Sequence, residues 1–264
     1  YEYLLNLKKR KEEVAKAITE QGKMTEEIQT AIDGCATLTE IEDVYRPFKQ
    51  KKKTRASVAI EKGLKPLAEF ILEQNGDPYA EAEKYIDAEK GVEYVAAAIA
   101  GARDIIAEII SDNAELRKKL RTLFENHGEI QVKMVEDDEK GTYAMYADYA
   151  ELVPEIKNHR VLAINRGEKE GCLKVKLYFN PDLAKRVCTA KCVHSKGACA
   201  DIITEAADDG YDRLIEPSIE REVRPILTDR ASEQAIKMFE VNLRPLLLQP
   251  PVKGNVALGL DPGY

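Results

Sequence analysis

The sequence predicts a mainly α-helical protein, a bundle of short helices with helix-turn-helix-like hairpins and one small antiparallel pair of strands. Three observations lead to this prediction. The chain is rich in Ala, Leu, Ile, Glu and Lys, and it has no Trp and only 6% aromatic residues. Apolar residues recur at helical spacing, and helix start and stop signals follow one another closely. With 264 residues, 44% of them hydrophobic, the chain can bury one large or two modest cores.

Helix signals are dense near the N-terminus. A first amphipathic helix should end in a left-handed turn at Gly22. Thr25 is a candidate N-cap for a second helix. Thr37 and Glu40 have the spacing of a capping box and should start a third helix, which Pro47 closes.

Further helices are predicted over residues 56–62 and from Pro66 onward. Residues 91–110 carry a wide apolar surface, as in a nearly buried helix. Asp112 is the expected N-cap of the next helix, over residues 114–126. The last two helices should form the central hairpin of the domain.

Alternating apolar residues predict strands over residues 129–135 and 172–179. We expect these strands to pair with each other, because an unpaired strand leaves backbone groups unsatisfied. Between them, residues 143–156 suggest helical turns, and residues 160–166 a further helix ended by Gly167.

Helical spacing returns in the last third of the chain. Asn180 restarts a helix, and residues 199–215 form another. A long helical segment over residues 217–248 contains Pro225 and Pro245, which should kink or divide it.

Charge and composition exclude several classes of protein. The net charge of -7 and the pI near 5.3 give the whole molecule no attraction for DNA or RNA, so such a contact must be local. No segment approaches the roughly 18 apolar residues of a membrane span, and no signal-peptide pattern opens the chain, so we expect a cytoplasmic protein. Five cysteines without regular spacing argue against a disulfide framework. Nucleotide-binding glycine motifs and nucleophile motifs are also missing, so we expect no enzyme and no cofactor.

A concentrated basic segment, residues 45–63, stands out in this acidic chain. In such a segment the cationic side chains can bind phosphates, and the aromatic rings between them can stack on bases. The alternative is a solvated connector whose lysines pair with acidic neighbours. On the first interpretation binding is weak and salt-sensitive, and charge reversal at residues 51–53 lowers its salt dependence. The candidate nucleic-acid-binding residues are Tyr45, Arg46, Phe48, Lys49, Lys51, Lys52, Lys53 and Arg55.

A cluster of thiols and one imidazole is the candidate metal site. Cys188, Cys192, His194 and Cys199 are chemically suitable zinc ligands. Structural zinc sites usually have ligand pairs set well apart, however, and these four residues lie within helix-forming sequence. Buried or loop thiols are therefore the favoured interpretation, with zinc as the alternative.

Three segments in the same order resemble the Tex family of bacterial transcription accessory proteins. They are YRPFKQKKKTRASVAIEKGLKPLA from residue 45, AGARDIIAEIISDNAELRKKL from residue 100, and IEPSIEREVRPILTDRASEQAIKMFEVNLRPLLLQPPVKGNVALGLDPGY at the C-terminus. The resemblance covers most of the chain. It implies a helical region over residues 1–127, a second one with the β element over 128–250, and a linker with the first strand of an RNase H-like domain over 251–264.

The resemblance also implies a function, as the helical scaffold of a factor that engages RNA or DNA during transcription. A protein-interaction module that docks on RNA polymerase or other transcription proteins is the rival hypothesis. A part of a metal-dependent nuclease is a third one, because Asp261 matches the opening-strand carboxylate of the RNase H-like domain. One carboxylate does not hold a catalytic metal pair, so Asp261 in this chain is expected to be a turn residue.

Overall fold

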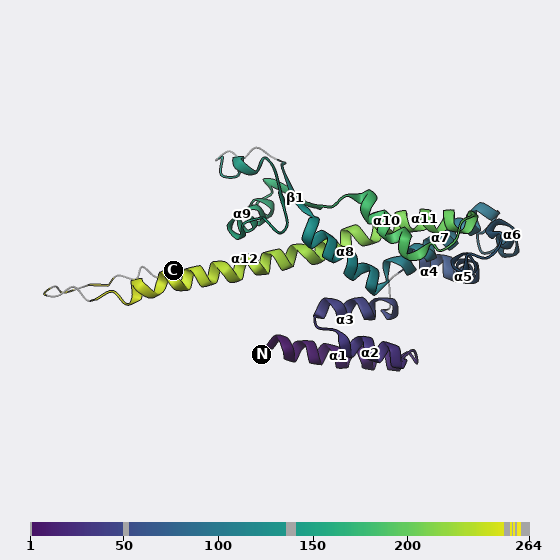
Figure 1. Ribbon diagram of the computed structural model, residues 1–264, viewed down its shortest axis with the longest axis horizontal. Helices are drawn as coiled ribbons and strands as arrows, with labels where there is room; N and C mark the ends of the chain where they lie inside the picture. The colour runs from purple at the N-terminus through teal and green to yellow at the C-terminus, as the bar shows by residue number, and fades with distance from the viewer. Residues whose placement is uncertain are drawn as a thin grey trace.

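The computed structural model describes residues 2–49, 53–135, 141–250, 254, 256, 258 and 259. Within these ranges the protein is mainly α-helical with one small antiparallel sheet, as the sequence predicts. Figure 1 shows an elongated molecule in which the long helix α12 (Glu216–Leu247) extends away from the helical body.

The first three helices form a unit with its own hydrophobic cluster. They are α1 (Glu2–Glu20), α2 (Glu26–Gly34) and α3 (Leu38–Tyr45), and Figure 1 shows α3 between α8 and the other two helices. The predicted helix signals are confirmed, because Gly22 has φ 67°, Thr25 caps α2, and Thr37 with Glu40 forms a capping box. We call this part the N-terminal unit, and its buried side chains are Leu7, Val14, Ile18, Ile32, Cys35 and Ile41.

Short helices continue the chain after a 3-10 turn at Arg46–Phe48. They are α4 (Arg55–Glu61), α5 (Lys65–Glu73), α6 (Pro78–Ala82) with a 3-10 turn at Glu83–Tyr85, α7 (Val95–Ser111) and α8 (Ala114–His127). The N-cap expected at Asp112 is wrong by one residue. Asn113 caps α8 instead, and its Oδ1 accepts a hydrogen bond from the Leu116 N–H at 2.9 Å.

The sheet has a strand that the sequence did not predict. Strand β1 (Glu129–Met134) pairs antiparallel with β3 (Leu173–Tyr178), as expected, and also with β2 (Asp148–Leu152), in the order β2-β1-β3. The helical turns expected at residues 143–156 are thus only partly right, because a 3-10 turn at Ala144–Tyr146 precedes β2.

Gly167 does not end a helix as expected. It lies inside α9 (Asn158–Lys169), and Gly171 with φ 82° follows the helix end. The missing side chain at Gly167 is needed for close packing, since a Cβ there would lie 2.6 Å from Leu173 Cδ1.

The last helices are α10 (Pro181–Cys192), capped by Asn180 as predicted, α11 (Ala198–Gly210) and α12. A π-helical turn at Tyr211–Ile215 joins α11 to α12 without a break. The prolines do not divide the helix, because α12 continues through both Pro225 and Pro245, and the kink expected as the alternative stays a prediction.

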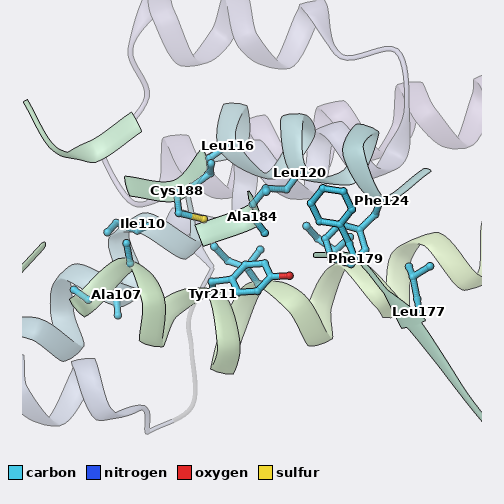
Figure 2. Packing of buried hydrophobic residues seen from close by; sticks show 14 of the residues in the cluster. Ala107, Ile110, Leu116, Leu120, Phe124, Leu177, Phe179, Ala184, Cys188 and Tyr211 are labelled. Carbon is cyan, nitrogen blue, oxygen red and sulfur yellow. The ribbon is translucent and has the colours of Figure 1, made fainter. Parts of the chain in front are cut away.

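The main hydrophobic cluster is formed by buried residues between Ala56 and Ala231. Figure 2 shows Leu116, Leu120 and Phe124 of α8 facing Ala184 and Cys188 of α10 and the ring of Tyr211. This cluster includes residues on both sides of the expected boundary at residue 127, so the two predicted regions share one hydrophobic core. The domain division itself stays a prediction.

The strand expected within residues 251–264 lies largely outside the described residues. In that range only Gly254, Val256, Leu258 and Gly259 are described, and none of the four is assigned to a strand.

Candidate nucleic-acid interface

The basic segment connects the N-terminal unit to α4. Lys49 and Lys53 are exposed beside the helix ends, and Arg55 is exposed at the first position of α4. The Thr54 side chain caps this helix through the Ser57 N–H at 3.0 Å. Lys51 and Lys52 lie outside the described residues.

The charge of Arg55 affects a nearby carboxylate, that of Asp209. A hydrogen bond from Arg213 is the main reason why the pKa of Asp209 is lowered, and the charge of Arg55 lowers it further. Part of the positive potential of Arg55 is therefore compensated within the chain.

Arg46 is turned toward the protein. Its Nε donates to Asp112 Oδ1 at 3.1 Å, and its Nη1 to Ser218 Oγ at 3.4 Å. Arg46 thus connects the segment after α3 to the end of α7 and the start of α12. The guanidinium joins parts of the fold that are far apart in sequence.

The two aromatic candidates contribute to packing. Tyr45 and Phe48 are half-buried against the hydrophobic cluster of the N-terminal unit. The guanidinium of Arg10 lies 5.8 Å from the ring centroid of Tyr45. The carbonyl of Phe48 accepts a hydrogen bond from Gln21 Nε2 at 2.9 Å. Both rings therefore have partners within the protein.

A buried charge cluster that the sequence did not predict lies beside this segment. Asp43 of α3 accepts hydrogen bonds from Arg117 at 2.8 Å and from Arg121 at 2.7 Å. Both arginines also pair with Glu222 of α12. Burial alone would raise the pKa of Glu222, but the charges of Arg117 and Arg121 lower it overall. We call Asp43, Arg117, Arg121 and Glu222 the buried charge cluster.

One signal of this cluster was present in the sequence. Arg117 and Arg121 are four residues apart, so they lie on the same face of α8. Their partners come from residues 43 and 222. No local pattern identifies partners at such distances along the chain.

The candidate zinc ligands do not form a metal site in the described part of the chain. There, no group of three or more His, Cys, Asp or Glu side chains could hold a metal ion. Cys188 is buried, and burial raises the pKa of its thiol to about 12. Cys199 Sγ lies 3.6 Å from the Gly76 carbonyl oxygen, and the backbone N–H of the exposed His194 donates to Gln74 Oε1 at 2.8 Å. The thiol interpretation fits this geometry.

The nuclease hypothesis and the expected absence of a membrane span concern other parts of the chain. Asp261, the candidate nuclease carboxylate, lies outside the described residues. Within the described ranges, no helix has both the length and the apolar character that crossing a bilayer requires.

Comparisons with known proteins identify relatives over the whole chain. A family model described as Tex central region-like matches residues 73–239. The uncharacterised protein YdcI of Bacillus subtilis is 45% identical over 100% of this chain, which spans 38% of that protein. The transcriptional accessory protein Tex of Neisseria gonorrhoeae is 34% identical over 100% of this chain and 36% of its own length. Protein YhgF of Escherichia coli is 32% identical over 99% of this chain and 35% of its own length. The chain therefore spans little more than a third of these relatives.

Proposed function

Because this chain belongs to the Tex family, we propose that it is the helical scaffold of a transcription accessory factor and contributes an auxiliary phosphate contact. The relatives support the transcription-related role, since one of them is named as a transcriptional accessory protein. A relative in Homo sapiens, 29% identical, is named as an S1 RNA-binding domain-containing protein. We therefore propose that this chain contributes to the binding of nucleic acid.

The observation that carries the proposal is the exposure of Lys49, Lys53 and Arg55 on one connecting segment of an acidic protein. Point charges on a surface segment attract phosphates without reading bases. The half-burial of Tyr45 and Phe48 favours a contact with phosphates alone. Such binding should be weak, independent of sequence and sensitive to salt.

The test is a titration of single-stranded RNA and DNA oligonucleotides of mixed sequence at several salt concentrations, followed by fluorescence anisotropy. The variant K49E/K53E/R55E should bind more weakly than the unchanged chain. Each phosphate contact on a single strand contributes about 0.7 to the slope of log K against log salt. Three lost contacts should therefore lower that slope by roughly 2.

The matched control is K8E/K9E/K16E on α1, which changes the net charge equally at exposed positions. It should reduce the affinity much less, since only the general field of the molecule changes. Equal losses in both variants would remove the basic segment from the proposal. Circular dichroism spectra of both variants verify that the helical content is unchanged.

A further inference from the structure

A groove on the surface between α8, α10 and the sheet has no assigned role. It has a volume of about 700 Å³, within the range typical of ligand sites. Helix α8 lines one wall with Lys119 and Leu123, and α10 lines the other with Leu183 and Arg186. Leu152 of β2 and Tyr178 of β3 also line it. We call this the α8–α10 groove.

The lining of the α8–α10 groove is mainly apolar, and several of its apolar side chains are exposed. Leu152 and Tyr178 are each 38% exposed, and Leu183 is 48% exposed. Apolar side chains gathered in a concave surface favour a ligand that buries them. Aliphatic residues predominate here, whereas single-stranded nucleic acids bind through aromatic stacking. The lining therefore favours the apolar side chains of a protein partner.

The charges at the edges of the groove are mainly positive. Lys119 and Arg186 lie on opposite walls. Glu129 is the acidic side chain of the lining, and its Oε1 accepts a hydrogen bond from Gln131 Nε2 at 2.8 Å. The nearby Glu115 is paired with Lys191 at 2.5 Å. In a chain of net charge -7, this local excess of cations is complementary to an acidic ligand.

We propose that the α8–α10 groove binds an acidic amphipathic helix of a partner protein. Leucine-like side chains on one face of the helix pack on Leu123, Leu152 and Leu183. Carboxylates at its flanks pair with Lys119 and Arg186. A groove between two helices that accepts the apolar face of a third is a recurrent form of peptide recognition. This inference is independent of the phosphate contact at the basic segment.

The test uses a fluorescently labelled synthetic helix with Leu on one face and Glu on the other, titrated with the 264-residue chain. Saturable binding is expected, and K119E/R186E should weaken it by at least roughly tenfold. L183D should weaken it similarly, since it places a carboxylate at an apolar contact. The control R166E/K169E, at exposed positions of α9, should bind like the unchanged chain. A probe with Lys in place of Glu should bind at least roughly tenfold more weakly.

Several outcomes would overturn the proposal. One is the absence of saturable binding up to about millimolar concentrations. Another is equal binding by K119E/R186E and the control. Displacement of the probe by a uridine-rich RNA, lost in K119E/R186E, would assign the groove to nucleic acid. The last is binding of the probe by this chain but not by a full-length relative. In that case the longer protein covers the groove with its own segment, and no partner helix binds there.

Discussion

Arg117 is fully buried, and its charge must be compensated within the protein. Asp43 and Glu222 provide this compensation, and Ser218 Oγ accepts a further hydrogen bond at 2.9 Å. Buried ion pairs contribute little net stability, but loss of one partner is costly, because the other charge is left unpaired. The buried charge cluster therefore fixes how α3, α8 and α12 meet more than it stabilises the fold.

The cluster leads to a prediction for Glu222→Gln. At pH 7 this variant should lose about 2 kcal/mol of unfolding free energy, since Arg117 and Arg121 lose a charged partner. The folded-state pKa of Glu222 is lowered, so its contribution is complete above the ordinary Glu pKa of about 4.3 and is lost as the pH falls further. Urea unfolding between pH 7 and pH 3 should show the difference from the unchanged protein shrinking at the acidic end. A difference that is independent of pH would contradict this assignment.

The charge cluster of the basic segment is visible in the sequence, but the directions of its side chains are not. Charge counting groups Arg46 with Lys49, yet Arg46 points at Asp112 and Ser218 while Lys49 is exposed. The partners of Arg46 are 66 and 172 residues away. Tertiary contacts of this kind leave no local pattern, whereas a cluster of like charges does.

At the scale of elements, local signals predicted helix starts well. Thr25, Thr37 and Asn180 accept hydrogen bonds from backbone N–H groups one turn ahead, and this depends only on neighbouring residues. Strand β2 was missed because it is short and its outer positions, such as Asp148 and Ala150, are polar or small. Pairing with β1 decides its conformation, in agreement with the context dependence of strand propensity.

Gly167 gives a prediction about how α9 packs on the sheet. A Cβ at this position would lie 2.6 Å from Leu173 Cδ1 and 3.0 Å from Tyr143 Cδ1. Gly167→Val should therefore push α9 away from β3 and cost about 1–3 kcal/mol through overpacking. The midpoint of urea unfolding measures this cost. Arg166→Val, at the exposed neighbouring position, should change stability by only about 0.5 kcal/mol, and equal effects would show that packing at Gly167 is loose.

At the scale of the whole molecule, hydrophobic burial is divided into two clusters in the described part of the chain. The N-terminal unit has the smaller one, and charged contacts connect it to the body. These contacts include Asp43 with Arg117 and Arg121, Glu40 with Lys118 at 2.6 Å, and Arg46 with Asp112. Since apolar burial is the dominant favourable contribution to folding, the N-terminal unit with its smaller cluster should be the less stable part.

We therefore predict that the N-terminal unit opens before the helical body. Amide hydrogen exchange should be faster in α1–α3 than in α7 and α11, which share the main cluster. Ile32→Ala should cost about 2–5 kcal/mol locally and accelerate exchange in α1–α3 alone, because Ile32 is buried in the smaller cluster. Ile106→Ala is the matched control in the larger cluster, and it should accelerate exchange in α7 and α11. Uniform acceleration across the chain by Ile32→Ala would show that the charged contacts couple the two parts into one cooperative unit.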